Sequence, residues 1–304
     1  MKTAFLFPGQ GAQTLGMGKD LYEENEVYKK VFDSIDDVLE ISLKAACFEG
    51  ENMEKSEYIQ PAIYAHSVAL FAVLEKSADI YAGLSLGEYS ALAVTGMLDI
   101  QKGAKLVNKR GAIMDNAVKS GVGGMLSVLG LVIEEVENTL GDSPDIWAAN
   151  HLSEKQIVIA GEKTALEEIQ PKFEEAGAKT VFLAVSGPFH TPMLKRASEI
   201  FKDLLKKADI EKPKAIIYSN YTGLPYEKKS DIVSMLANQM CSRVRWHDTM
   251  EKLISEGVNE FVEIGPSMVL SKMLKRRLKG EDISISSVRD LKSLNKYLEK
   301  QKEK

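Results

Sequence analysis

Strand-like apolar runs alternate with helix-like segments along most of this 304-residue chain, and this order constrains its fold most strongly. Thr3–Phe7 is a short apolar run ended by a proline-glycine pair, and Ile80–Ala82 is a second such run. Pro61–Ser77 and Leu98–Lys119 repeat apolar residues at the spacing of a helix, with the proline of the former expected in the first turn. The alternation predicts an α/β fold with a mostly parallel sheet.

A different order begins at the glycine-rich segment 121–124. From there the patterns predict strand, helix, strand, strand, helix and strand at Met125–Leu129, Ile133–Leu140, Ile146–Asn150, Gln156–Ala160, Lys163–Ala176 and Lys179–Ala184. This is a ferredoxin-like arrangement. We therefore expect residues 122–190 to be an inserted subdomain, and residues 1–121 and 191–304 to form the larger domain. The larger domain resumes with a helix and three strands at Pro192–Ala208, Ala215–Ser219, Glu260–Ile264 and Ile283–Ser286.

The composition restricts the class of protein. Apolar residues make up 44% of the chain, enough for a large core without disulfides or metal. Cys47 and Cys241 form no metal-binding motif, and scarce cysteine suits a reducing compartment. No apolar run fits a signal peptide or the roughly 18 residues of a membrane span. The net charge of −5 argues against general nucleic-acid binding. We expect a soluble, cytoplasmic protein that binds neither membranes nor nucleic acid.

Residues 83–87, Gly-Leu-Ser-Leu-Gly, fit the G-x-S-x-G pattern between an expected strand and an expected helix. So sharp a turn needs small residues two positions before and after the serine. It exposes the serine hydroxyl at the end of the strand and leaves the amide of Leu86 free to stabilise an anion. Ser85 is therefore a candidate nucleophile. The alternative is a serine that only caps a helix.

A serine nucleophile needs a base, and the chain has four histidines. Three lie in an apolar helix or near turns, where packing accounts for them: His66, His151 and His247. His190 lies between two prolines at the expected domain junction, where a rigid loop positions a base well. Its alternative role is loop packing or capping. No obvious acidic turn residue precedes this mid-chain histidine, which disfavours an esterase of the usual order.

The glycine-rich loop at residues 7–13, Phe-Pro-Gly-Gln-Gly-Ala-Gln, follows the first strand. It fits neither nucleotide-binding pattern, because G-x-G-x-x-G requires glycine at Thr14 and a P-loop requires glycine at Gln13. The remaining interpretation is a tight loop whose Gln10 amide completes an oxyanion hole with that of Leu86. A plain turn at the end of a strand is the alternative.

Seven motifs together resemble the malonyl-CoA:acyl carrier protein transacylase family, in the order seen there and from Thr3 to about Leu278. They are Phe7–Gly11, Gln60–Ala62, Gly83–Tyr89, Arg110-Gly111, Gly187–His190, Gln239 with Val244–Trp246, and Glu263–Pro266. The resemblance implies an α/β-hydrolase-like large domain with an inserted ferredoxin-like subdomain. It also implies transfer of malonyl from malonyl-CoA to acyl carrier protein for fatty acid biosynthesis, with no metal or other cofactor.

The resemblance implies a role for each matching residue. Ser85 would carry the malonyl group, and His190 would be the base, oriented near Gln239 instead of by a carboxylate. The amides of Gln10 and Leu86 would form the oxyanion hole.

Further implied positions concern the substrate and the partner. Arg110 would bind the malonyl carboxylate bidentately. Gln239, Gln60 and Phe189 would also line the substrate site, the last leaving little room for a methyl branch. Lys275 and Arg276 would meet the carrier protein, which is acidic. The residues from Ser271 onward carry a net charge of +6, although a solvated C-terminal helix would look the same.

Three residues depart from the family pattern: Leu84, Leu152 and Arg243 stand where histidine, asparagine and proline are usual. Their effect on substrate recognition is open. Three other functions also stay open: an acyltransferase of the same type in polyketide synthesis, a thioesterase or other hydrolase with the same Ser-His pair, and a non-catalytic module that binds carrier protein.

Overall fold

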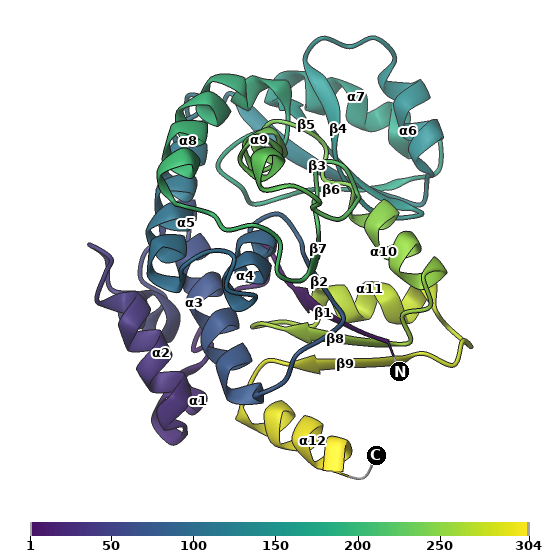
Figure 1. The fold of residues 1–304 in the computed structure, drawn as a ribbon. Coiled ribbons are helices and arrows are strands. Elements are labelled where there is room, and N and C mark those ends of the chain that lie inside the picture. Colours follow the sequence, from purple (N-terminus) through teal and green to yellow (C-terminus); the bar gives the residue numbers. More distant parts are fainter. Residues whose placement is uncertain (1, 303–304) are drawn as a thin grey trace.

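The structure is a computed structural model that describes residues 2–302, which form two β-sheets (Figure 1). The larger sheet is parallel, with strand order β7-β2-β1-β8-β9. Its strands are Thr3–Phe7 (β1), Ile80–Gly83 (β2), Ile216–Tyr218 (β7), Glu260–Ile264 (β8) and Ser284–Val288 (β9). The predicted parallel sheet is confirmed.

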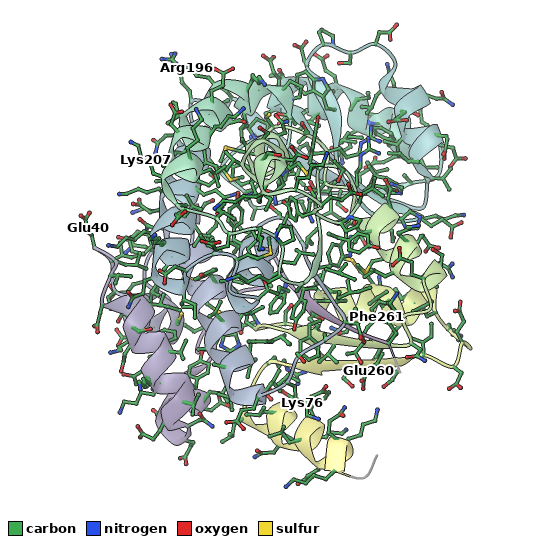
Figure 2. The ribbon with its side chains drawn as sticks, in the orientation of Figure 1. Glu40, Lys76, Arg196, Lys207, Glu260 and Phe261 are labelled. Atoms are coloured by element: carbon green, nitrogen blue, oxygen red, sulfur yellow. The ribbon has the colours of Figure 1, made fainter. Side chains whose placement is uncertain are left out.

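Alternate residues of β1 face opposite sides of this sheet, and helices cover both sides. Phe5 and Phe7 join the core on one side, whereas Ala4 and Leu6 join the core on the other. The first side is covered by α3 (Ser56–Leu74), α4 (Gly87–Val94) and α5 (Ile100–Asp115), and the second by α10 (Trp246–Ser255) and α11 (Val269–Arg277). Figure 2 shows Phe261 of β8 inside the molecule and Lys207 at its edge, in keeping with full burial of the former.

The smaller sheet is antiparallel, with strand order β4-β5-β3-β6. Its elements are Gly123–Leu129 (β3), Ile133–Leu140 (α6), Ile146–Ser153 (β4), Gln156–Glu162 (β5), Lys163–Glu175 (α7) and Lys179–Phe182 (β6). Both helices pack on one face, and the unit lies above the larger sheet in Figure 1. The predicted fold class is confirmed, whereas the division of the chain into 1–121 with 191–304 and 122–190 stays a prediction.

Helix α3 begins earlier than expected, so Pro61 lies inside it and the prediction of a first-turn proline is wrong. Because proline has no N–H, the carbonyl of Glu57 loses its usual helical donor. Asn108 of α5 replaces that donor, with Nδ2 3.0 Å from Glu57 O. The neighbouring helix thus satisfies the carbonyl, which local sequence rules do not include.

The remaining helices complete the layers: α1 (Lys19–Glu24), α2 (Glu26–Asp36), the π-helical turn η1 (Ala45–Glu49), the 3₁₀ turn η2 (Pro192–Leu194), α8 (Lys195–Lys207), α9 (Lys229–Met240) and α12 (Leu291–Lys302). Within residues 2–302, no helix has both the length and the apolar character to cross a membrane.

Because β1, β2 and β7 are neighbouring parallel strands, the loops that follow them meet at one edge of the sheet. These loops hold Gln10, Ser85 and Asn220.

Candidate active site

Ser85 lies in the tight turn between β2 and α4. Its backbone φ is +51°, in the left-handed region that residues other than glycine rarely adopt. A Cβ atom on Gly83 would lie 1.9 Å from the carbonyl carbon of Gly87, and one on Gly87 would lie 2.1 Å from Phe7 O. Only glycine therefore fits at the two flanking positions, for the steric reason that the sequence pattern implies.

His190 approaches the hydroxyl of Ser85 from the loop before η2. The Oγ of Ser85 lies 2.8 Å from Nε2 of His190, and Nδ1 of His190 lies 2.7 Å from the backbone oxygen of Gln239. A carbonyl oxygen only accepts, so Nδ1 carries the proton and Nε2 is free to accept the proton of Ser85. Burial, and then the charge of Arg110, lower the pKa of His190 to about 3, which keeps the imidazole neutral. This is the state that a general base requires.

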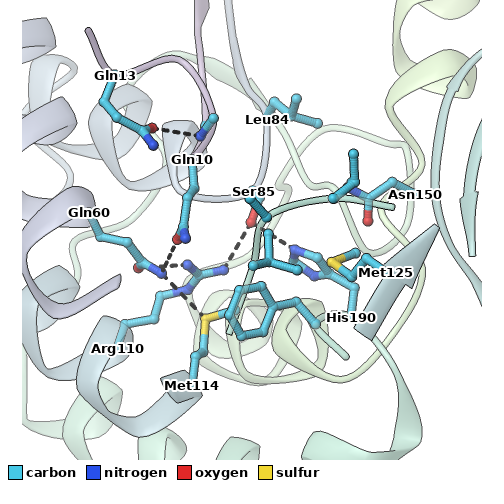
Figure 3. Close-up of a pocket in the computed structure, with 16 residues that line it drawn as sticks. Gln10, Gln13, Gln60, Leu84, Ser85, Arg110, Met114, Met125, Asn150 and His190 are labelled. Carbon is cyan, nitrogen blue, oxygen red and sulfur yellow. Dashed lines mark hydrogen bonds between the residues drawn. The ribbon is translucent and has the colours of Figure 1, made fainter. Parts of the chain in front are cut away.

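Arg110 of α5 is buried beside the same hydroxyl (Figure 3). Its Nη2 donates to Ser85 Oγ at 3.1 Å and to Gln239 Oε1 at 2.9 Å. Its Nη1 donates to Gln60 Oε1 at 2.8 Å. The guanidinium carbon lies 5.3 Å from the ring centre of Tyr89. Two neutral amide oxygens thus hold the cation without cancelling its charge, so it can attract an anionic substrate.

The proposed oxyanion donors come from two adjoining segments, Gln10 from the loop after β1 and Leu86 from the serine turn. A Cβ on Gly9 would lie 2.5 Å from Leu84 O, so the loop after β1 packs directly against the serine turn. Among the described residues, no group accepts a hydrogen bond from the backbone amide of Gln10 or of Leu86. The side chain of Gln10 is held separately, with Nε2 donating to Ser56 Oγ at 3.0 Å. Both amides can therefore serve a reaction intermediate.

A cavity of about 360 Å³ opens over these groups. Its polar lining includes Gln10, Gln13, Gln60, Ser85, Arg110, Asn150 and His190, and its apolar lining includes Leu84, Met114, Met125, Leu183 and Phe189. Among the described lining residues, Arg110 is the only one with a full charge at neutral pH. The cavity thus suits a small acyl group that ends in an anion.

Two buried polar residues at the site were missed by sequence reasoning: Glu88 and Asn220. Asn220 follows β7, and its Oδ1 accepts from the amide of Ser85 at 2.5 Å while its Nδ2 donates to Gly83 O at 2.7 Å. Burial raises the pKa of Glu88 to about 7, although hydrogen bonds from Tyr226 and then Gln239 lower it. A usable signal existed for Asn220, because a polar residue just after a parallel strand often faces the ligand.

Other sequence-predicted residues lie away from the cavity. Lys275 and Arg276 are exposed on α11 and do not line it. Of the departures, Leu84 lines the cavity, whereas Leu152 does not and Arg243 forms an ion pair with Glu137.

The other three histidines also lie elsewhere. His66 is buried against Tyr28, and the rings of His151 and His247 lie tilted to each other with their centres 4.6 Å apart. Within residues 2–302, no cluster of three or more histidine, cysteine or acidic side chains is arranged to hold a metal ion.

Comparisons with known proteins point to the same family over nearly the whole chain. The model of the acyl transferase domain family matches residues 4–299. The malonyl CoA-acyl carrier protein transacylase of Bacillus subtilis (strain 168) is 40% identical over 291 residues, which cover 91% of this chain and 92% of that protein. The crystal structure of the transacylase of that name from Clostridium perfringens has a TM-score of 0.94 at 39% identity and covers 100% of this chain and 98% of its own. A malonyl-transacylase in complex with a type II polyketide synthase acyl-carrier protein has a TM-score of 0.93 at 34% identity and covers 99% and 100%.

Proposed function

The chain belongs to the acyl transferase domain family, and we propose that it transfers malonyl from malonyl-CoA to the phosphopantetheine thiol of acyl carrier protein. One observation carries the proposal: in a single cavity, the hydroxyl of Ser85 contacts both the neutral base His190 and the cation Arg110. A nucleophile with a base suits acyl transfer, and the adjacent guanidinium suits an acyl group with a terminal carboxylate.

The first half of the reaction acylates the enzyme. Nε2 of His190 accepts the proton of Ser85 as Oγ attacks the thioester carbonyl. The resulting oxyanion is stabilised by the amides of Gln10 and Leu86, and losing one such donor typically costs about 3 kcal/mol in the barrier. The carbon–sulfur bond then breaks, the imidazolium returns its proton to the leaving sulfur, and coenzyme A departs with a free thiol.

The second half reverses these roles. The pantetheine thiol of the carrier protein gives its proton to Nε2 of His190 and attacks malonyl-Ser85. Collapse of the second tetrahedral intermediate breaks the ester, and the proton passes back to Oγ of Ser85. Arg110 binds the malonyl carboxylate through both steps and fixes the acyl group in the cavity. Gln60 and Gln239 hold the guanidinium, and the buried ring of Phe189 limits the width of the acyl group.

We extend the proposal to the carrier protein's docking surface. Lys275 lines a surface hollow together with four more basic residues, Arg289, Lys292, Lys296 and Lys300. Arg276, beside it on α11, is exposed. Such a basic surface supports steering of an acidic partner.

The pathway and the compartment are part of the same proposal. We assign the enzyme to fatty acid biosynthesis, with a polyketide pathway as the alternative, since one solved relative is bound to a polyketide carrier protein. We place it in the cytoplasm, which suits two cysteines that are both free and buried, Cys47 and Cys241.

Intact-mass measurement tests the reaction. The wild-type protein mixed with malonyl-CoA should gain the mass of one malonyl group, and added carrier protein should remove it. Ser85→Ala should gain none. A wild-type protein that stays unlabelled, yet binds carrier protein, would be a binding module instead. Release of free malonate at a rate equal to or above transfer would favour a hydrolase.

A further inference from the structure

Gln239 of α9 connects the base to the cation. Its backbone oxygen accepts from Nδ1 of His190, and its side-chain Oε1 accepts from Nη2 of Arg110 at 2.9 Å. Its Nε2 donates to the backbone oxygen of Ser85 at 2.9 Å and to Oε2 of Glu88 at 2.7 Å. The site therefore depends on which way the amide of Gln239 faces.

Glu88 is one of the two acceptors that fix that direction, the other being the backbone oxygen of Ser85, and its contact with Gln239 is the shorter. It is fully buried on α4, and each of its three neighbours donates to it: the hydroxyl of Tyr226, the backbone amide of Asn220 and the side-chain amide of Gln239. An ionised carboxylate only accepts, so it holds the NH₂ group of Gln239 toward itself. The oxygen of Gln239 must then face Arg110. The opposite orientation would set NH₂ against the guanidinium, so that the NH₂ group and the N–H that Arg110 now donates to Gln239 would both lose their acceptors.

We propose that Glu88 is a positioning residue that sets the preference of the enzyme for acyl groups ending in a carboxylate. It does so through Gln239, which holds Arg110 beside Ser85. The inference rests on the proposed function, because it takes malonyl-CoA as the substrate. An acyl group without the carboxylate, such as acetyl, does not use Arg110 and serves as the internal reference.

The first test replaces the carboxylate by its neutral isostere. Rates of acyl-Ser85 formation are measured by quenched intact mass with malonyl-CoA and with acetyl-CoA. In Glu88→Gln, one donor of the cluster loses its acceptor, and only the backbone oxygen of Ser85 then holds the NH₂ group of Gln239 by an obligatory acceptor. The ratio of malonyl to acetyl rates should then fall about tenfold or more.

Tyr226→Phe is the matched control. It removes another hydrogen bond to the same carboxylate but leaves the contact between Glu88 and Gln239 in place. Its ratio should stay within about twofold of wild type. A ratio in Glu88→Gln equal to that of the wild type would overturn the inference. So would an equal fall in both variants, which would indicate only a damaged buried cluster.

A second measurement needs no variant and so does not depend on how Glu88→Gln folds. The charged or titratable groups that face Glu88 are Arg110 of α5, Tyr89 of α4 and Tyr226 after β7, and both tyrosines have pKa values raised by burial. Since the pKa of Glu88 is about 7, lowering the pH protonates it before any of them changes. The wild-type ratio should fall as the pH goes from about 8 to about 6, whereas changes at His190 cancel in the ratio.

A wild-type ratio that is constant over this range would overturn the inference. Failure of the proposed function looks different, because the wild type would then either take up no malonyl on Ser85 or release it as free malonate instead of passing it to carrier protein. If the wild type is labelled and prefers malonyl while its ratio responds neither to Glu88→Gln nor to pH, only the inference about Glu88 is lost.

Discussion

Asn220 and Ser85 are 135 residues apart in the chain, yet the side-chain amide of Asn220 makes two hydrogen bonds to the backbone of the serine turn. Its oxygen accepts from the amide of Ser85, and its nitrogen donates to the carbonyl of Gly83. Because Ser85 has a positive φ, its backbone is strained, and such a conformation persists only where its surroundings hold it. The side chain of Asn220 supplies part of that restraint.

Replacing Asn220 by alanine should therefore slow formation of acyl-Ser85 by about tenfold to a hundredfold, because the hydroxyl loses its fixed position. Two buried backbone groups also lose their partner, at a cost of about 1 to 3 kcal/mol each. Single-turnover acylation and urea unfolding measure the two effects. Asn238→Ala, at a half-buried asparagine of α9, is the control and should acylate at the wild-type rate. Normal acylation in Asn220→Ala would show that the turn at Ser85 keeps its conformation without the side chain of Asn220.

Arg110→Ala should abolish the preference for malonyl. We expect kcat/KM for malonyl transfer to fall by about a hundredfold or more, while that for acetyl transfer changes only a few-fold. Arg110→Lys keeps the charge but not the planar guanidinium, so its rate of malonyl transfer should lie between those of the wild type and Arg110→Ala. Steady-state rates with both thioesters give the answer. If Arg110→Ala still prefers malonyl as the wild type does, Arg110 does not bind the carboxylate.

Gly83→Ala should prevent the serine turn from forming. The new Cβ would lie 1.9 Å from the carbonyl carbon of Gly87, so strand β2 or helix α4 would have to move. We expect a loss of about 3 kcal/mol or more in the free energy of unfolding, together with loss of acylation. Gly124→Ala is the matched control, since its new Cβ would contact only Leu166 Cδ1, at an ordinary 3.5 Å. Urea unfolding of both variants makes the comparison, and equal stabilities would contradict the steric argument.

Acid should destabilise the protein partly through His66. Burial lowers the pKa of this histidine from 6.5 to about 4, so between these pH values the unfolded chain binds a proton that the folded chain does not bind. The stability contributed by the neutral ring is complete above about pH 6.5 and is lost as the pH falls toward 4. At pH 5 the loss amounts to about 2 kcal/mol.

The variant His66→Asn isolates this contribution. Its Oδ1 can still accept from Tyr28, whose hydroxyl lies 2.7 Å from Nδ1 of His66, and it does not titrate. Between about pH 7.5 and about pH 5, the wild type should therefore lose about 2 kcal/mol more stability than the variant. Other titrating groups, Glu88 included, act in both proteins and cancel. Equal losses in the two proteins would show that His66 accepts a proton in the folded state.

Local patterns predicted most of the fold and several site positions. The strands β1 and β8 have the predicted bounds, because short apolar runs between turn residues leave few other conformations. The tight turn at Ser85 and the rigid loop at His190 were located from glycine and proline, which restrict the backbone directly. The prediction at Pro61 failed because Asn108, from another helix, removes the usual cost of an internal proline.

By itself, the sequence determined the parallel sheet, the strands and helices of the antiparallel sheet, and the turn in which only glycine can flank Ser85, since each follows from steric and hydrophobic preferences of neighbouring residues. Only the tertiary structure decided which polar groups meet. The contacts of Ser85 with Arg110 and His190 span 25 and 105 residues, and that of Glu88 with Gln239 spans 151. Burial then altered their chemistry, because a histidine or a glutamate away from water keeps its neutral form over a wider range of pH.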